Sequence, residues 1–320
     1  MSLPKPLVII LALMMNVLLP LNILLGIAFS SYSSGLHFLI ECLIAGEILL
    51  LLFFGAYWEY TSVYLRYVYL TLFLLAVLWA VYQSWGLPWW PARGDLGVEI
   101  TEFLTLGVMT VLLGSTIMGL FPKAHAFQLT FPFREGRYLI VEGGDAKWSF
   151  LLNYHYHYGR HRRSQSSNRM RYATDIVKLD GKGMTNRGIV PGDVHSYFIY
   201  GETVYSPCAG KVVWVGNDKP DNVAYSGSYP HGIGNGVVLQ QGNYYIVLGH
   251  FRAASVRVQE GEVVREGQIL GEVGNAGFTP RPHLHLQVSY SAAENYVGGQ
   301  GVPILFKGQF PTKNQVFQLS

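Results

Sequence analysis

The stretch Pro282-His283-Leu284-His285-Leu286-Gln287-Val288 alternates polar and apolar side chains after its first residue. A period of two predicts a β-strand, in which residues two apart face the same side. His283 and His285 would then point into one site, while Leu284 points into a core. Two imidazoles on one face of a rigid strand indicate a possible metal site.

Further metal-ligating side chains lie in the same half of the chain: His155, His157, Asp175 and His250. Zinc accepts imidazole nitrogen and carboxylate oxygen, and a catalytic zinc site combines three protein ligands with one open position. A lone H-x-H pair is common, so the additional residues are what favour a zinc centre. The alternatives are structural: a strand histidine can simply be hydrogen-bonded, and Asp175 could cap a turn. For His195 and His231, in predicted loops, the structural reading is preferred.

Short strand-like runs precede the opening stretch. They cover residues 138–141, 204–205, 211–215, 236–240 and 244–248, and glycine and proline separate them. This pattern predicts an all-β domain, either a barrel or a sandwich. We expect no long helix after Phe121, and we expect surface loops at residues 159–169 and 217–235.

The first part of the chain has a different composition, which predicts a domain boundary between residues 1–122 and 123–320. Four apolar stretches, at residues 7–29, 38–58, 63–81 and 98–121, reach or approach the roughly 20 residues that a membrane-spanning helix needs. We therefore expect an α-helical transmembrane bundle of about four helices, with the lipid bilayer as a partner. Trp58, Trp85, Trp89 and Trp90 lie near span ends and are expected to be interfacial anchors.

The first span is longer than the core of a signal peptide and lacks a clear cleavage site, so we expect it to be retained. Glu47 is the acidic residue deepest in a span, and we expect it to face the bundle interior. The two cysteines, Cys42 in a span and Cys208 in the second part, are not expected to pair.

The two parts of the chain differ in net charge. Residues 1–122 carry a net charge of −3, and the remainder carries +6. The second part, including the basic run 160–163, would suit an anionic polymer or lipid surface, although ordinary solvated charge explains it equally well. No nucleic-acid partner is expected.

The membrane orientation can be predicted from the basic residues on each side. With an even number of spans, both ends of the chain lie on the same side of the membrane. That side holds Lys5, Arg66, Lys123, Arg134 and Arg137, whereas the other side holds Arg93. Counting basic residues places the second domain in the cytoplasm.

Five stretches of the second part form a recognisable set: Gly201-Glu-Thr-Val-Tyr-Ser-Pro-Cys-Ala-Gly-Lys-Val-Val213, Gly234-Asn-Gly-Val-Val238, Gly249-His-Phe251, residues 256–274, and residues 277–288 with Pro-His-Leu-His. With these stretches the chain resembles the lysostaphin/LytM-type zinc endopeptidase family over roughly residues 130–290. The resemblance implies a LytM-like barrel or sandwich of the duplicated hybrid motif type. It also implies a zinc held by two histidines and one aspartate, with two more histidines nearby.

Carried onto this sequence, the resemblance implies Asp175 and His285 as ligands and His250 and His283 as catalytic neighbours. The family's usual second histidine would stand four residues before the aspartate, where this chain has Arg171. One branch of the family takes that ligand from an upstream Asn-aromatic-His segment, which Asn153-Tyr154-His155 resembles. His155 is therefore the expected third ligand, and His157, which would share its strand face, stays open.

The function expected from this resemblance is a membrane-anchored zinc endopeptidase that cleaves peptide bonds of peptidoglycan. Its C-terminal domain would then be periplasmic or extracellular, in a multi-pass protein of the cytoplasmic membrane. Two alternatives stay open. Arg171 favours a metal-free module that binds and activates another cell-wall enzyme, and the glycine-bounded strand pattern at residues 263–273 also occurs in lipoyl-like and phosphotransfer barrels of transport systems. We rank the transport alternative last, because neither the hairpin-tip lysine nor the phosphorylatable histidine that such barrels need is evident, and four spans are few for a transporter.

Overall fold

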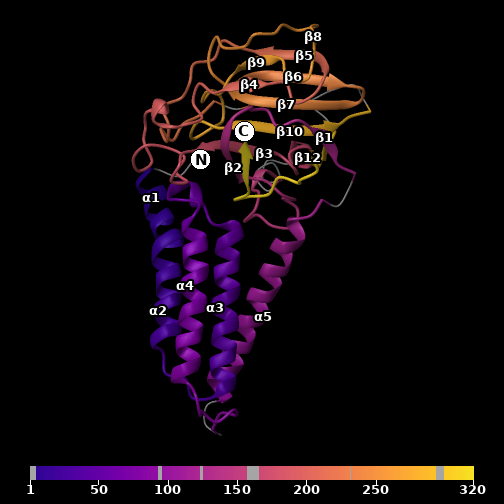
Figure 1. The fold of residues 1–320 in the computed structure, drawn as a ribbon. Coiled ribbons are helices and arrows are strands. Elements are labelled where there is room, and N and C mark those ends of the chain that lie inside the picture. Colours follow the sequence, from indigo (N-terminus) through magenta and orange to yellow (C-terminus); the bar gives the residue numbers. More distant parts are fainter. Residues whose placement is uncertain (1–4, 93–95, 123–124, 157–165, 231, 293–298) are drawn as a thin grey trace.

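The computed structural model describes residues 5–92, 96–122, 125–156, 166–230, 232–292 and 299–320. Helices form an elongated bundle, and a β-rich part sits on one end of it (Figure 1). The last long helix ends at Gly119 and the first strand begins at Phe127.

Four helical spans in the described residues are long and apolar enough to cross a membrane, as the sequence predicts. The first is continuous from Lys5 to Phe29 and consists of α1 (Lys5–Leu13), a π-helical segment η1 (Met14–Leu18) and α2 (Leu19–Phe29). The others are α3 (Gly35–Gly55), α4 (Leu65–Gln83) and α5 (Leu96–Gly119). In the first span, α4 and α5, most of the large apolar side chains whose burial is described face outward, which is the pattern of helices whose solvent is lipid.

The tryptophans at the ends of the spans behave in two ways. Trp85, Trp89 and Trp90, at the end far from the β-rich part, are 85%, 54% and 70% exposed, which suits interfacial anchors. Trp58 is 1% exposed, so its prediction as an anchor is wrong. It lies in a 3-10 turn, η2 (Trp58–Tyr60), donates its indole N–H to the Leu52 carbonyl at 2.9 Å, and packs above Tyr69.

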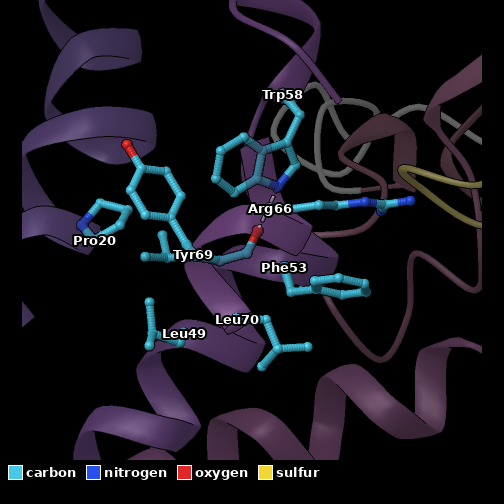
Figure 2. Close-up of a pocket in the computed structure, with 8 residues that line it drawn as sticks. Pro20, Leu49, Phe53, Trp58, Arg66, Tyr69 and Leu70 are labelled. Carbon is cyan, nitrogen blue, oxygen red and sulfur yellow. Dashed lines mark hydrogen bonds between the residues drawn. The ribbon is translucent and has the colours of Figure 1, made fainter. Parts of the chain in front are cut away.

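Arg66 is buried close to Trp58 and is 7% exposed (Figure 2). Its guanidinium lies 4.6 Å from the centre of the Phe53 ring and donates a hydrogen bond to the Tyr67 hydroxyl. Glu47, on α3, is half-buried against α5, where its carboxylate accepts a hydrogen bond from Thr110 at 2.7 Å. This hydrogen bond to α5 agrees with the expectation that Glu47 faces the bundle interior.

The β-rich part is built on one nine-stranded sheet with the order β13-β2-β3-β10-β7-β6-β5-β8 and with β11 also pairing with β10. The central strands are β2 (Gly136–Glu142), β3 (Thr174–Leu179), β10 (Leu284–Tyr290), β7 (Tyr244–Phe251), β6 (Asn235–Gln241) and β5 (Gly210–Gly216). The outer strands are β8 (Val263–Val264), β11 (Gln300–Val302) and β13 (Val316–Leu319). Two two-stranded sheets complete the part, namely β1 (Phe127–Leu129) with β12 (Ile304–Phe306), and β4 (Thr203–Tyr205) with β9 (Ile269–Glu272).

The prediction of a β-rich C-terminal part is confirmed, but the strands in the described residues do not close into a barrel. The main sheet is open, because its order ends at β13 on one side and at β8 on the other. Periodicity predicts strands and the side that each residue faces, whereas closure depends on pairing between distant strands.

The main sheet packs against other residues on both of its faces, and one of these faces contacts the helical bundle. Tyr138, Ile140 and Ile176 point into the core of the β-rich part. The alternate residues Leu139, Val141, Val177 and Leu179 pack in one cluster with Trp58, Val63 and Leu52 of the helical part. Strands β2 and β3 are therefore buried on both sides, and the sheet is docked on the bundle.

The two predicted surface loops differ from expectation. Residues 217–234 contain no strand or helix where described, but Ala224 and Tyr225 are 3% and 8% exposed because they pack against Val8 of α1 and Val190. In the segment 159–169, residues 159–165 lie outside the described residues. The remainder is a short helix, α7 (Ser166–Arg169). A 3-10 turn, η3 (Val194–Ser196), lies between β3 and β4.

Candidate metal centre

Three adjacent strands, β3, β10 and β7, hold three of the predicted site residues, and a fourth lies directly before β10. His285 on β10 stands directly opposite Asp175 on β3 and Gly249 on β7. His250 follows Gly249, and His283 immediately precedes β10. Because cross-strand neighbours lie about 5 Å apart, this register alone brings residues 110 positions apart into contact. His285 is thus in a strand, as its alternating pattern predicts.

His155 comes from a separate segment between β2 and β3. It lies in a helical turn at residues 155–156, so the prediction of a strand there is wrong, and His157 lies outside the described residues. Asn153 fixes the position of this turn. It is fully buried and donates from its amide to the carbonyls of Ala173 at 2.8 Å and Gly144 at 3.3 Å.

Asn153 also orients the imidazole of His155. Its side-chain oxygen lies 2.9 Å from Nδ1 of His155, and since this oxygen can only accept, Nδ1 carries the proton. Nε2 is then unprotonated and faces Asp175 Oδ2 at 3.4 Å. Histidine ligands of metals usually donate their second N–H to such an oxygen acceptor. His155 therefore has the arrangement of a ligand.

His155, Asp175 and His285 each offer one ligand atom, and these atoms lie within 4.8 Å of one another. Two ligands of a tetrahedral zinc, each about 2.0–2.2 Å from the metal, would be about 3.4 Å apart. The separation between His155 Nε2 and Asp175 Oδ2 is 3.4 Å. All three residues are buried, with exposed fractions of 8%, 3% and 4%. This donor set fits zinc.

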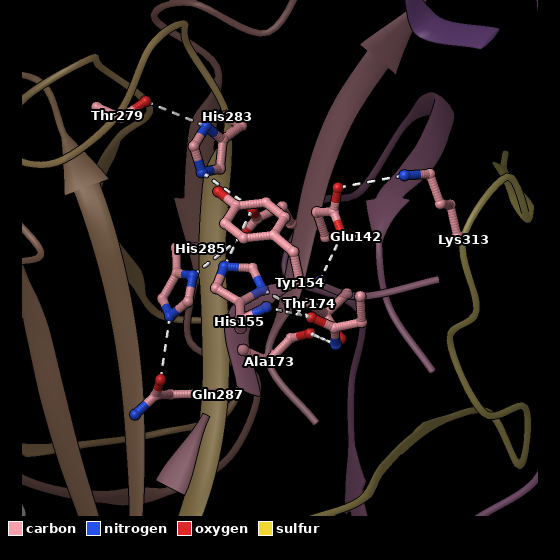
Figure 3. A network of polar contacts seen from close by, with 12 residues as sticks. Glu142, Tyr154, His155, Ala173, Thr174, Thr279, His283, His285, Gln287 and Lys313 are labelled. Atoms are coloured by element: carbon pink, nitrogen blue, oxygen red, sulfur yellow. Dashed lines mark hydrogen bonds and ion pairs between the residues drawn. The ribbon is translucent and has the colours of Figure 1, made fainter. Parts of the chain in front are cut away.

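Gln287 lies two residues after His285 on the same strand face, 3.1 Å from Nε2 of that histidine through its side-chain oxygen. When Nε2 donates to this oxygen, Nδ1 of His285 is unprotonated. Nδ1 and Asp175 Oδ1, 2.9 Å apart, then face each other as two acceptors, an arrangement that a shared cation stabilises. Figure 3 shows the contact between His285 and Gln287, with His155 beside the His285 ring.

His250 and His283 stand beside the three presumed ligands. Nδ1 of His250 donates to the Ala276 carbonyl at 2.8 Å, and Nδ1 of His283 donates to the Arg281 carbonyl at 2.9 Å. Both residues therefore present an unprotonated Nε2, and that of His283 is 3.4 Å from Asp175 Oδ2. The ring centres of the two histidines are 4.7 Å apart. His250 holds this position with a backbone φ of 67°, a strained value for a residue with a Cβ.

The electrostatics of the cluster keep the imidazoles of His155, His250 and His283 neutral. Burial lowers the pKa of His155 to about 4, and it lowers the pKa of His283 and, strongly, that of His250. Burial by itself would raise the pKa of Asp175, but the nearby histidines His155 and His283 bring it well below its ordinary value. Neutral imidazoles beside an ionised carboxylate are the protonation states that metal binding requires.

Arg171, at the position of the family's usual ligand, takes no part in this cluster. Its guanidinium makes two hydrogen bonds of 2.6 Å to the carboxylate of Asp145, which is fully buried. Arg171 therefore holds the segment that follows β2, and His155 occupies the place beside Asp175.

The structure adds two buried ion pairs that sequence patterns gave no reason to select. Arg281, two residues before His283, pairs with Glu59 of η2 at 2.8 Å. Lys313 pairs with Glu142 at 3.2 Å, and the second oxygen of Glu142 accepts the backbone N–H of Tyr154 (Figure 3). Both pairs brace the segments that carry site residues.

The remaining predicted histidine with a described position lies away from this cluster. His195 is exposed in η3, and its ring packs against Tyr200. His231 and the basic run 160–163 lie outside the described residues.

Comparison with protein families identifies a domain in the second part of the chain. Residues 196–297 match the model described as Peptidase family M23. The match includes His250, His283 and His285, and it begins after His155 and Asp175. The predicted resemblance to lysostaphin-type peptidases is confirmed for this range. No curated protein matches the chain.

Several solved structures are similar to part of the chain. A mutant catalytic domain of the prophage-encoded M23 protein EnpA from Enterococcus faecalis is 21% identical, with 41% of this chain and 72% of that chain covered and a TM-score of 0.27. Lysostaphin from Staphylococcus simulans is 22% identical, with 41% and 42% covered and a TM-score of 0.27. A zinc-containing peptidase from Vibrio cholerae is 19% identical, with 55% and 39% covered and a TM-score of 0.30. The chain thus spans less than half of the last two proteins.

Proposed function

We propose that the protein is a membrane-anchored zinc metalloendopeptidase, because residues 196–297 match the model of Peptidase family M23. The observation that carries the proposal is the convergence of His155, Asp175 and His285, from three separate segments, on one point. His155 and His285 would bind zinc through nitrogen and Asp175 through oxygen, and His250 and His283 would be the catalytic neighbours.

In the proposed site, zinc and the two neighbouring histidines would have different roles. Zinc held there would activate a water molecule and polarise the scissile carbonyl. His250 and His283 each have a neutral ring with an unprotonated Nε2. One of the two accepts the proton of the water at Nε2 and passes it to the leaving amine. The other stabilises the negative charge that develops on the carbonyl oxygen.

We propose the peptide part of peptidoglycan as the substrate, which places the C-terminal domain on the periplasmic or extracellular side. The count of basic residues favours the opposite side, although long domains translocate largely regardless of charge. A tag at Ser320 tested with an impermeant reagent in intact cells distinguishes the two orientations. A tag that reacts only after lysis would exclude peptidoglycan and leave a zinc peptidase with another substrate.

The alternative function is a metal-free module that activates another cell-wall enzyme. Arg171 in place of the family's usual ligand is the observation that favours it. Under this alternative the histidine cluster has a structural role only, and the protein binds peptidoglycan or a partner enzyme without cleaving it.

The experiment that tests the proposal uses the full chain in detergent micelles with soluble peptidoglycan peptides and mass spectrometry of the products. We expect cleavage that stops on chelation and returns with zinc. His283→Ala should lower turnover by roughly 10²–10⁴-fold, the usual contribution of a proton-transfer group. His195→Ala is the matched control and should retain full activity. Intact peptides after zinc loading of the unmodified protein would favour the metal-free alternative.

A further inference from the structure

A cavity of about 770 Å³ lies between the helical bundle and the β-rich part. Its lining comes from α1, η1, α2, α3, α5 and η2 on one side and from the segments around Tyr154, Tyr225 and Pro280 on the other. Its size is that of sites for small organic ligands, which are about 300–1,000 Å³. Nothing in the peptidase mechanism above requires a cavity on the membrane side.

The membrane half of the cavity is hydrocarbon-like except for Asn16. Its walls include Leu11, Met15, Leu19, Ile48 and Leu51. Met15 lies in the π-helical segment η1, a local departure from α-helix that is frequent at functional sites. An extended peptide backbone would leave its polar groups unsatisfied against such walls, whereas an alkyl chain has none to satisfy.

The other half of the cavity is lined by tyrosines: Tyr57, Tyr60, Tyr154, Tyr225 and Tyr229. Tyrosine rings are apolar at one end and polar at the other, so they suit a boundary between hydrocarbon and a polar group. The hydroxyls of Tyr60 and Tyr225 lie 3.2 Å apart. The cavity thus changes from apolar to mixed polarity toward the β-rich part.

The tyrosine end of the cavity adjoins the metal centre. The ring of Tyr154 lines the cavity and stacks on the imidazole of His155, with centres 4.8 Å apart and planes at 13°. Pro280, also in the lining, immediately precedes Arg281, whose carbonyl holds His283. A ligand with its chain in the apolar half therefore has its head within reach of the proposed ligands and catalytic histidines.

From this polarity and this continuity we propose that the cavity binds the hydrocarbon chain of a lipid-linked peptide, whose peptide part reaches the metal centre. The inference rests on the proposed peptidase function and names its substrate class. The bilayer would supply the substrate laterally, between helices.

The test measures binding separately from cleavage. The full chain in lipid nanodiscs is photolabelled with N-hexadecanoyl-tetra-alanine that carries a diazirine in the middle of its alkyl chain, and labelled residues are mapped by mass spectrometry. We expect labels on the cavity walls formed by α1, η1 and α3. Unlabelled hexadecanoyl-tetra-alanine should compete better than hexadecanoic acid, and chelation of zinc should leave labelling unchanged.

Two adjacent methionines give a matched pair of variants. Met15 lines the cavity, whereas Met14 is 48% exposed and is not part of the lining. The larger side chain of Met15→Trp would displace at least two methylene groups of the bound alkyl chain from the cavity. Because each buried methylene group contributes to binding, labelling should fall roughly tenfold. Met14→Trp should label like the unmodified protein. Unchanged unfolding temperatures for both variants would show that the effect is local.

Labels outside the cavity walls, or equal labelling of both variants, would overturn the inference. Equal competition by hexadecanoic acid would identify a site for ordinary membrane lipid, and preferential labelling by a diazirine-bearing transmembrane peptide would identify a protein partner; either result also overturns it. Cleavage of soluble peptides without cavity labelling removes this inference alone. Labelling without any peptidase activity removes the proposed function and leaves a lipopeptide-binding site.

Discussion

The ion pair between Glu59 and Arg281 links the membrane side of the protein to the catalytic histidines, and we predict that Glu59→Gln weakens both the fold and the reaction. The side chain of Glu59 is 0% exposed and that of Arg281 is 10% exposed, with 2.8 Å between the charged atoms. The Arg281 carbonyl accepts hydrogen bonds from Thr279 and from Nδ1 of His283. Movement of Arg281 therefore displaces His283.

The expected loss follows from leaving a buried cation without its partner, which costs about 3–5 kcal/mol. In this variant the Arg281 guanidinium still has its cation–π contact with the Tyr60 ring, whose centre is 4.9 Å away. We therefore expect the lower value, about 3 kcal/mol. In a chain of 320 residues that corresponds to a fall in melting temperature of roughly 4–5 °C. Turnover should also fall while zinc content stays unchanged, because neither residue is a presumed ligand.

The matched control is Glu202→Gln. Glu202 pairs with Lys178 at 2.5 Å, but the two side chains are 26% and 27% exposed, so the loss should be at most about 1 kcal/mol. Replacing both partners of the buried pair, Glu59→Gln with Arg281→Met, should recover part of the stability, since no unpaired charge is left. Thermal unfolding in detergent measures all four proteins. If Glu59→Gln has no larger effect than Glu202→Gln, the pair does not hold the site in place.

Two further predictions concern the presumed ligands. Asn153→Ala removes the oxygen that orients His155 and should weaken zinc binding about 10–100-fold, measured by competition with a chelator; unchanged affinity would remove Asn153 as a positioning residue. The second concerns pH. The pKa of His155 is lowered from 6.5 to about 4, so the unfolded chain binds the proton first as pH falls. The contribution of neutral His155 to the free energy of unfolding of the zinc-free protein is therefore fully present above about pH 6.5. It declines by about 3 kcal/mol as the pH falls toward 4. His155→Gln should flatten that decline between pH 7 and 4.5, His195→Gln should not, and equal profiles would contradict the argument.

Local patterns in the sequence predict a large part of this molecule. Long apolar stretches predict the four spans, and the alternation around Leu284 predicts β10, because both depend on the period of the chain itself. The same reasoning fails for Trp58, whose position near a span end resembles that of an anchor although its ring is buried under the sheet.

Contacts between distant segments are beyond such patterns. Glu59 and Arg281 are 222 residues apart, and Lys313 and Glu142 are 171 apart, so no local signal pairs them. His155 was selected through a family resemblance, and its turn depends on the buried amide of Asn153. The apolar cavity likewise requires helices and loops from both parts of the chain.

The central claim is that His155, Asp175 and His285 bind one zinc ion. Elemental analysis of the full chain, purified in detergent and dialysed against trace zinc, measures this directly. We predict close to one zinc per chain, lost in His285→Ala and in Asp175→Ala and retained in the control His195→Ala. An unmodified protein without zinc, or a His285→Ala variant that keeps its zinc, would contradict the claim.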